Sequence, residues 1–468
     1  MPTNFKLIIM VRNRVCILVL ALLTMTAIHS CKTEKKAKFT GANGEVKLIT
    51  LDPGHFHAAL VQKNMYAQVH PDVVVYAPGG DDLNEHLKKI EGYNTRADNP
   101  TLWKEEVYRG ENFFAKMIAE KKGNLMVTAG NNGKKTEYIK ATLDAGINVL
   151  ADKPMAINVQ NFELLKQAFE LAAQNNVLLY DIMTERSEIT SILQREFSQL
   201  PEIFGTLEKG TPENPAVTKE SVHHFFKEVS GSTLKRPAWF YDVEQQGEGI
   251  VDVTTHLVDL VQWGCFPEVI LDPKDVNIIS AKRWTTDMSK EQFSLSTALP
   301  EYPEYLKKDV RDGLLRVYSN GEINYTLKGV HAKVTVIWNY VAPEGTGDTH
   351  YSIMRGTKAN LMVRQGAEQG YKPVLYIEPL VKIDEKTLTD NLAKVQAKYH
   401  GVELKKLETG WEVLVPQKYH VGHEAHFGQV TERFLQYLVD GKLPDWEVPN
   451  MITKYYTTTK ALEVAKGK

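Results

Sequence analysis

A carboxylate, an amine and a proline follow one another in Asp152, Lys153 and Pro154, directly after the apolar run Asn148–Ala151. Such a run is typical of a buried parallel strand, and ligands of open α/β sheets lie just beyond the carboxyl ends of the strands. We therefore expect Lys153 to point into a cleft, with Pro154 fixing the backbone where the sheet needs no further amide. A lysine at a strand end can also be an ordinary solvated residue, so this pattern needs a partner.

A second polar set, Asp252, His256 and Asp259, follows Gly249 far downstream. The pattern predicts a helix from about Ile250 to Trp263, on which Asp252 and His256 stand at i and i+4 on one face. An acid beside an imidazole suits a general base held against a substrate hydroxyl. The same arrangement is also compatible with a hydrogen bond on a solvated helix face.

The turn after the first predicted strand carries Asp52, Gly54, His55 and His57. An acid with two imidazoles is the kind of cluster that binds a divalent transition metal. One hypothesis is therefore a metal-dependent hydrolase that uses Asp52, His55 and His57 to activate a water molecule. In a loop, the same histidines could instead donate hydrogen bonds to a phosphate.

The elements that position these residues follow from the apolar periodicity. Between Val46 and Arg186 short apolar runs alternate with amphipathic stretches, which predicts a Rossmann-like, doubly wound parallel sheet over residues 46–186. The predicted strands are Lys47–Asp52, Val73–Ala77, Leu125–Thr128, Asn148–Ala151 and Val177–Ile182. The predicted helices are His57–Gln68, Asp82–Ile90, Phe113–Lys121, Lys134–Ala145 and Asn161–Gln174.

Residues 187–468 show a different pattern. Long stretches of alternating apolar and polar residues predict an α+β substrate-binding domain with a large open antiparallel or mixed sheet. These stretches are Gly313–Lys328, Ala332–Val341 and Tyr351–Val363, and helices near Glu424–Val439 and Thr453–Ala465 close the chain. An open sheet of this size needs a cover, so a homo-oligomer formed through it is one expectation.

The N-terminus has the layout of an export signal. Basic residues precede an apolar run that ends near Ala27 and is too short for a stable membrane span. We assign residues 1–30 to a signal peptide, Cys31 to lipid attachment and residues 31–45 to a polar, lysine-rich tether. The prediction is an exported protein, anchored by this lipid at the periplasmic or outer-membrane face of the cell envelope. The alternative is an ordinary signal peptide with an accidental cysteine.

Composition argues against two further features. The formal net charge is −2, and the sequence contains no basic block interleaved with aromatic residues, so we expect no nucleic-acid partner. The chain has three cysteines. Because one of them lies in the predicted signal peptide and Cys31 is assigned to lipid, the mature fold cannot depend on internal disulfides.

Taken together, the motifs resemble those of the Gfo/Idh/MocA oxidoreductases. The run Val127–Ala156 resembles the family segment that ends in Glu-Lys-Pro, with Asp152 in place of the glutamate, and Asn132 falls where the family has a cofactor-contacting asparagine. The tail His423–Leu443 is similar to the family's closing helix, so the likeness spans nearly the whole mature chain. The family's second motif is matched by Gly249, Asp252, His256 and Asp259.

The resemblance implies an enzyme that moves a hydride between a nicotinamide cofactor and a hydroxyl carbon of its substrate. Lys153 would stabilise the developing alkoxide, His256 would exchange the hydroxyl proton, and Asp252 would orient the substrate and tune that imidazole. The residues that would contact NAD or NADP are Asp52, Gly54, His55, His57, Asn132, Asp152, Lys153 and Pro154.

The glycine-rich turn departs from the family's pattern. A dinucleotide-binding turn normally needs three glycines, but here Gly54 alone matches, and Asp52 stands where the first glycine should be, close to the pyrophosphate. The acidic residue expected for the ribose is missing at the end of the second strand. Asp81 and Asp82 follow a little later and suit either the ribose or a helix cap.

The substrate implied by the resemblance is a sugar, glycoside or polyol. Trp239 and Tyr241 could stack on a sugar ring, with Asp252 and Asp259 as polar contacts, although aromatic residues there could equally be packing. Because a cell envelope holds no pool of free nicotinamide cofactor, we expect the cofactor to stay bound and to be recycled in a redox-neutral sugar conversion or cleavage. A further hypothesis, favoured by the altered turn, is a non-catalytic carbohydrate-binding envelope lipoprotein.

Overall fold

The computed structural model describes residues 38–229 and 232–467, so the predicted signal peptide, Cys31 and the start of the tether lie outside the described residues. A compact unit begins at Phe39, which packs against the first hydrophobic core. The Glu45 carboxylate accepts hydrogen bonds from the amides of Thr40 and Gly41, so the end of the predicted tether belongs to the fold. Among the described residues, no helix combines the length and the apolar character needed to cross a membrane.

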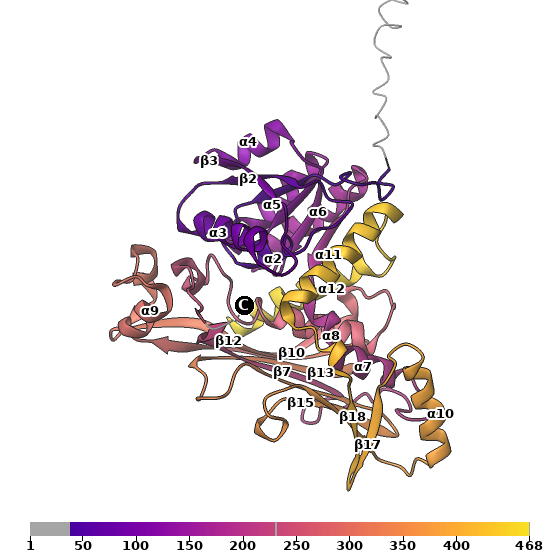
Figure 1. The fold of residues 1–468 in the computed structure, drawn as a ribbon. Coiled ribbons are helices and arrows are strands. Elements are labelled where there is room, and N and C mark those ends of the chain that lie inside the picture. The colour runs from indigo at the N-terminus through magenta and orange to yellow at the C-terminus, as the bar shows by residue number, and fades with distance from the viewer. Residues whose placement is uncertain (1–37, 230–231, 468) are drawn as a thin grey trace, which may run out of the picture. The chain divides into compact units, whose positions relative to one another are not determined.

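Six parallel strands form the first sheet, in the order β3-β2-β1-β4-β5-β6 (Figure 1). This order confirms the predicted Rossmann-like sheet. The chain changes its direction of winding between β1 and β4, and open α/β sheets bind their ligands at this kind of switch point. The strands are β1 (Leu48–Leu51), β2 (Asp72–Ala77), β3 (Lys104–Arg109), β4 (Leu125–Thr128), β5 (Asn148–Asp152) and β6 (Leu179–Ile182).

The elements of this first part differ from the sequence prediction at β3 and at the ends of α2 and α3, the last of which runs to Thr95 instead of Ile90. Strand β3 was not predicted, because it is an edge strand rich in charged residues and lacks the apolar run of a central strand. Helix α2 ends at Leu60 instead of Gln68, and just beyond its end the Gln62 carbonyl accepts a hydrogen bond of 2.6 Å from the Trp103 indole. The helices are α2 (His57–Leu60), α3 (Asp81–Thr95), α4 (Phe113–Glu120), α5 (Asn132–Asp144) and α6 (Val159–Gln174).

Ten strands form the second sheet, which is mixed, as predicted. Strand β13 runs parallel to β7, whereas the other paired neighbours are antiparallel. The strands are β7 (Val217–Phe226), β10 (Val276–Met288), β11 (Val310–Arg311), β12 (Leu314–Leu327), β13 (Val330–Val341), β14 (Thr349–Arg355), β15 (Ala359–Arg364), β16 (Val374–Pro379), β17 (Glu403–Leu407) and β18 (Gly410–Leu414). A short hairpin, β8 (Glu228–Val229) with β9 (Ser232–Thr233), follows β7.

Helices cover the second sheet from one face. Helix α7 (Ile189–Ser198) packs against β15 and β16, and α8 (Thr254–Cys265) packs against β7 and β13. Strands β12 and β13 alternate buried with less buried residues, the pattern of a sheet with one covered face. Helix α9 (Lys290–Thr297) and helix α10 (Glu385–Gln396) lie toward opposite ends of this sheet (Figure 1).

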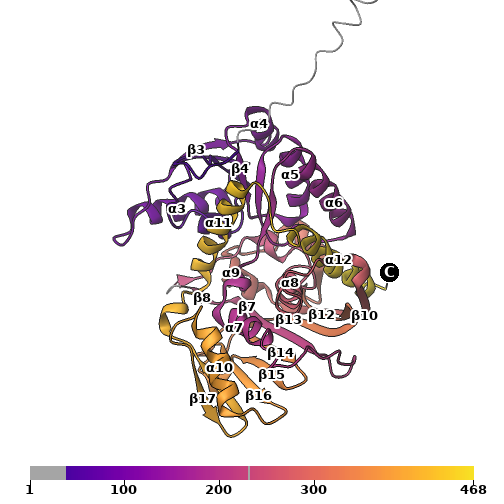
Figure 2. The ribbon, with the colours of Figure 1, turned by 90° about the vertical axis from the view of Figure 1, so that its right-hand side faces the viewer.

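The last two helices return to the first part of the chain. Helices α11 (His423–Asp440) and α12 (Glu447–Ala465), gold in Figures 1 and 2, run beside the parallel sheet. Phe434 and Tyr455 are buried in the same hydrophobic core as the strands of that sheet. Helix α12 also packs against α6, α8 and β10, so it joins the two sheets into one body.

Candidate active site

The two motifs singled out in the sequence meet in the structure. Lys153 follows β5, and its Nζ lies 2.6 Å from Oδ1 of Asp252, which precedes α8. The two side chains are only 12% and 7% exposed, so this ion pair is held in a largely dry position. Pro154 is buried and joined to Lys153 by a cis peptide bond.

The predicted helix carrying both Asp252 and His256 is wrong at its start. Helix α8 begins at Thr254, and Asp252 lies in the turn before it, where its amide binds the Glu248 carbonyl. The cause is Gly249, because a Cβ there would lie 1.7 Å from the carbonyl oxygen of Ser319. The chain is thus pressed against β12 in a turn instead of a helix.

His256 lies in the first turn of α8. Burial, followed by the charge of Lys153, lowers the pKa of His256 well below its usual value. Its Nδ1 is buried without a hydrogen-bond partner among the described residues. Because Nδ1 is closed to a substrate, a proton exchanged with one would have to go to Nε2.

Gln246, which the sequence analysis missed, holds Asp252 in place. Its Nε2 donates to Asp252 Oδ2 at 3.0 Å, and its backbone carbonyl accepts from the side-chain Nδ2 of Asn132 at 2.8 Å. Asn132 also accepts from Lys135, whose Nζ donates to the carbonyl of Asp152 at 2.9 Å. A chain of hydrogen bonds therefore runs from the end of β5, through the start of α5, to the acid of the second domain. Burial lowers the pKa of Lys135 to about 8.

The turn after β1 has the backbone conformation of a glycine-rich turn, although most of its residues are not glycine. Asp52 has a φ of 49°, a left-handed conformation that favours glycine. A Cβ on Gly130 would lie 2.4 Å from the Asp52 carbonyl, so the turns after β1 and β4 touch through their backbones. Burial raises the pKa of the Asp52 carboxyl, which favours its uncharged form and weakens the repulsion expected toward a pyrophosphate.

Both histidines of this turn face the acid at the end of β5. His57 Nδ1 lies 2.9 Å and His55 Nδ1 lies 3.8 Å from Oδ2 of Asp152. Burial lowers the pKa of each imidazole well below its usual value, so both are neutral. The hypothetical metal set Asp52, His55 and His57 is therefore wrong in one member. Asp52 points instead toward the Tyr138 hydroxyl, 3.4 Å away.

Residues 239–246, here called the crossing segment, connect the second domain to both turns of the first. At one end, the Trp239 indole donates to Asp82 at 2.8 Å, and a Cβ on Gly54 would lie 3.1 Å from the Trp239 ring. At the other end, the Gly133 amide donates to the Gln245 carbonyl at 2.9 Å. Asp82 thus serves an interdomain contact, and Asp81 begins α3.

The structure removes Tyr241 from the predicted substrate contacts. Tyr241 is 1% exposed and packs in a core with Phe225 and Phe293. Its hydroxyl lies 2.9 Å from the Ser296 hydroxyl. The prediction for Tyr241 was wrong because aromatic residues of this segment form the core beneath the cleft, whereas Trp239 stays partly exposed.

Asp259 is also not available to a substrate. Its Oδ2 accepts from Arg186 Nε at 2.6 Å, and its Oδ1 accepts from Arg186 at 2.7 Å and from Lys454 at 2.8 Å. Arg186 also binds Glu447 at 2.8 Å, and Lys454 binds Asp181 at 2.7 Å. Asp259 is thus the centre of a buried ion cluster that ties α8, η1 (Thr184–Ser187), α12 and β6 together.

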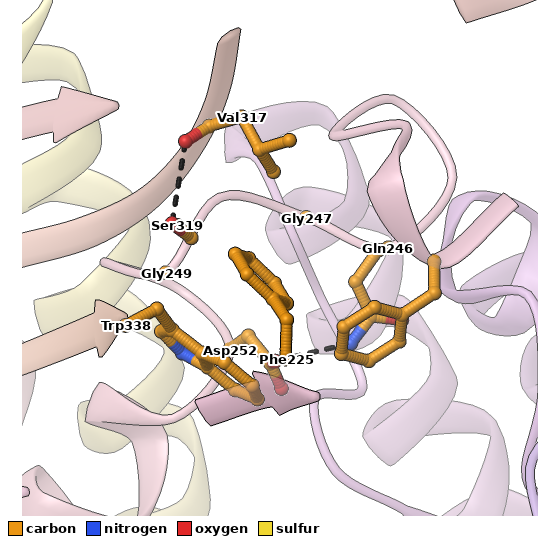
Figure 3. A pocket seen from close by; sticks show the side chains of 9 residues that line it. Phe225, Gln246, Gly247, Gly249, Asp252, Val317, Ser319 and Trp338 are labelled. Atoms are coloured by element: carbon orange, nitrogen blue, oxygen red, sulfur yellow. Dashed lines mark hydrogen bonds between the residues drawn. The ribbon is translucent and has the colours of Figure 1, made fainter. Parts of the chain in front are cut away.

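A small aromatic pocket adjoins Asp252 (Figure 3). The rings of Phe225 and Trp338 are stacked with centroids 4.9 Å apart, and Gln246 and Asp252 lie beside them, joined by their hydrogen bond (Figure 3). Ser319 adds a hydroxyl to the lining. The pocket's volume of about 20 Å³ has room for a water molecule, and Phe225 and Trp338 are only 1% and 8% exposed.

A second group of polar residues lies near Lys153, and of its members His423, next to His426 on the final helix pair, is the one whose spacing the sequence shows. Asp348 binds the Lys227 amine at 2.5 Å and lies 3.3 Å from His223 Nδ1. His423, at the start of α11, lies 3.7 Å from Glu185. Burial raises the pKa of Glu185. These residues come from β7, η1, α11 and two loops, so no local sequence pattern could have gathered them.

Two family models match the sequence. The model described as "Oxidoreductase family, NAD-binding Rossmann fold" matches residues 85–181, and the model described as "Putative oxidoreductase C terminal domain" matches residues 193–466. The first match starts after the altered turn that follows β1. None of the curated proteins matches the sequence.

Solved structures share this architecture. A "putative oxidoreductase" from Parabacteroides merdae ATCC 43184 is 62% identical, and the match covers 92% of this chain and 100% of that chain with a TM-score of 0.91. Levoglucosan dehydrogenase, in complex with NADH and levoglucosan, is 12% identical over 90% of this chain and 97% of its own, with a TM-score of 0.57. KijD10, a 3-ketoreductase from Actinomadura kijaniata, is also 12% identical, covers the same shares and has a TM-score of 0.53. The last two show the fold alone.

The fold, the paired motifs and the family matches together settle the class. This chain belongs to the Gfo/Idh/MocA family of NAD(P)-dependent oxidoreductases. The residues present fit such a cofactor, because Asp52 keeps the left-handed backbone of a glycine turn after β1, and Gly79 and Gly80 leave the backbone after β2 open to solvent. The turns after β1 and β4 touch through their backbones at the switch point of the sheet, where Rossmann-like folds bind their ligands.

Proposed function

We propose that the enzyme transfers a hydride between a tightly held NAD or NADP and a hydroxyl carbon of a sugar, glycoside or polyol. The observation that carries this proposal is the ion pair of Lys153 with Asp252, 2.6 Å apart at the carboxyl end of the parallel sheet. His256, kept neutral by burial, is the third member of this group.

The cofactor would be held along the carboxyl ends of β1, β2, β4 and β5. Gly54 and Asn132 lie at the switch point, Asp81 follows the open backbone after β2, and Lys153 follows β5. When bound, the nicotinamide supplies the acceptor or donor of the hydride. The protein's own residues bind and orient the substrate, exclude water and move the hydroxyl proton.

Each residue of the group has a separate task. The Lys153 ammonium stabilises negative charge on the substrate oxygen as its proton leaves, because it lies in a largely water-free position. The neutral His256 takes up that proton or returns it. Asp252, held by Lys153 and Gln246, accepts a hydrogen bond from the substrate and fixes its orientation.

The substrate class rests on the polar pair at the sheet edge and on enzymes that share the fold. Lys153 and Asp252 offer a donor and an acceptor to the hydroxyl groups of a sugar. Levoglucosan dehydrogenase, which shares the fold, binds a sugar derivative together with NADH. KijD10 is a 3-ketoreductase bound to NADP.

Retention of the cofactor is supported by the crossing segment. It contacts the turn after β1 through Trp239 and Gly54, and the start of α5 through Gln245 and Gly133. A nucleotide lying between those two turns would have to break these contacts in order to leave. Retention agrees with the proposed export and with a lipid anchor on Cys31, because the envelope holds no free cofactor. The hydride would then return within one redox-neutral conversion or cleavage.

Two measurements test this proposal. Denatured, purified protein should release about one NAD or NADP per chain, identified by its mass. The substitution Lys153→Met should keep the nucleotide but lower kcat/KM by about 10³-fold, the cost of losing a group that stabilises a developing oxyanion. The matched control is Lys166→Met, an exposed lysine on α6 that should leave both values unchanged. Sugar binding that survives in a wild-type protein without turnover or nucleotide would instead show a non-catalytic binder.

A further inference from the structure

Two imidazoles and a carboxylate converge at the carboxyl end of the first sheet. His55 and His57 follow β1, and Asp152 ends β5. Atoms of these three side chains that could ligate a metal lie within 4.8 Å of one another. We propose that His55, His57 and Asp152 bind one divalent transition-metal ion, and we call this group the histidine–aspartate site.

The distances suit such an ion. His57 Nδ1 and His55 Nδ1 lie 2.9 Å and 3.8 Å from the same oxygen, Asp152 Oδ2. With metal–ligand bonds of about 2.1 Å, these separations correspond to angles of about 90° and about 130° at the metal, on either side of the tetrahedral value. Small rotations of the two rings would complete the geometry.

A simple histidine–aspartate pair does not explain the arrangement. Such a pair needs one imidazole, and His57 already supplies it with a hydrogen bond of 2.9 Å to Asp152. His55 brings a second ring to the same oxygen, with the two ring centroids 4.0 Å apart. The Nδ1 of His55 otherwise faces the His57 amide at 3.4 Å, which is a weak hydrogen bond that a metal ligand can give up.

An anion is a poorer occupant than a cation. A phosphate held by His55 and His57 would lie next to the carboxylate of Asp152, which repels it. A divalent cation is instead attracted by that carboxylate and accepts electron pairs from both neutral imidazoles. The ligand set of two histidines and one aspartate is one that zinc and iron sites use.

The neighbouring cations do not prevent binding, because each of them is already engaged. Lys153 is paired with Asp252 at 2.6 Å. Lys135 donates to the Asp152 carbonyl, and Lys227 is paired with Asp348 at 2.5 Å.

The site is accessible and lies beside the reacting group. The side chains of His55, His57 and Asp152 are 18%, 11% and 6% exposed, so an ion could enter and keep an open position for water or a substrate oxygen. Asp152 directly precedes Lys153 in the chain. If the proposed hydride transfer holds, an ion here would polarise the substrate hydroxyl together with Lys153. Binding of the ion itself does not depend on that function.

The test is a titration of the chelator-treated, full-length protein with Co²⁺, followed by its visible absorbance and by competition with Zn²⁺. Wild-type protein should bind about one ion per chain. His57→Ala and Asp152→Asn should each weaken binding by about 100-fold or more, because loss of an outer-shell partner alone costs 10- to 100-fold. The matched control is His70→Ala, which removes a surface histidine 3.7 Å from Asp72 and should leave binding unchanged.

Asp152→Asn keeps the size of the side chain, so it carries the test if His57→Ala fails to fold. The proposal is overturned if wild-type protein binds Co²⁺ no more tightly than Asp152→Asn. Nucleotide content is measured on the same samples. Metal binding without nucleotide would leave the histidine–aspartate site standing while the proposed hydride transfer falls.

Discussion

Replacing Asp259 by alanine distinguishes two roles for this residue. The structure places it in a buried ion cluster, whereas the sequence predicts that it contacts the substrate. The substitution removes the hydrogen bonds of 2.6 and 2.7 Å to Arg186 and of 2.8 Å to Lys454. Lys454 keeps Asp181 and Arg186 keeps Glu447, but two donors of Arg186 lose their acceptor in the protein interior. Removing one partner of a buried ion pair costs about 3–5 kcal/mol.

This cost is large beside the total stability of a folded domain, which is about 5–15 kcal/mol. We expect the urea midpoint of Asp259→Ala to fall by about 1–2 M at neutral pH, for a slope of about 3 kcal/mol per molar. Unfolding is followed by tryptophan fluorescence and by circular dichroism, so that both domains report. The kinetic parameters of the folded fraction should stay close to those of the wild type.

The control is the same substitution at a surface ion pair. Asp445 lies 3.7 Å from Lys442 and its side chain is 83% exposed, so Asp445→Ala should cost about 1 kcal/mol or less. An unchanged midpoint for Asp259→Ala, together with a raised KM for the sugar, would refute the structural role and restore Asp259 as a substrate ligand.

Two further predictions concern pH. Burial raises the pKa of Glu105 on β3 to about 7, so its proton is held more tightly in the folded state and the protein loses stability as the pH rises from about 4.5 to 7. Glu105→Gln keeps the acceptor for Gln62 and should therefore be more stable than wild type at pH 8 by up to about 3 kcal/mol, yet equal at pH 4.5, as measured by urea unfolding. For His256, whose pKa burial lowers, the acid limb of kcat/KM should lie below pH ~6.5, and His256→Asn should abolish that limb. A limb at pH 7 or above that survives in His256→Asn would assign the proton transfer to another group.

The sequence predicted the pairing of Lys153 with the acid of the second motif but not the path between them. Motif residues at strand ends lie at one edge of a sheet, so that much follows from the order of elements. The predicted start of α8 is four residues too early. The close backbone contact between Gly249 and Ser319, a residue of a strand far along the chain, cannot be seen in the local sequence. Apolar periodicity predicts that a helix forms, but it does not report a tertiary contact that moves the first residue of that helix.

The metal cluster shows the same limit more clearly. The histidine pair is visible in the sequence, and closeness along the chain favours Asp52 as its acid. The structure supplies Asp152 from β5, two strands away in the sheet. Likewise, Glu185 and Asp348 come from distant parts of the chain, and nothing in their local sequence distinguishes them from surface residues.

The position of α11 and α12 decides when the first half of the chain can finish folding. Phe427, Phe434 and Tyr455 complete the core of a sheet whose first strand begins at Leu48. A chain leaving a ribosome or a translocation channel must therefore release its final helices before its earliest strands are fully covered. A truncation that removes α11 and α12 should therefore leave the core of the first sheet uncovered, although that sheet is encoded at the other end of the gene. A fragment ending at Arg186 should expose apolar surface and aggregate.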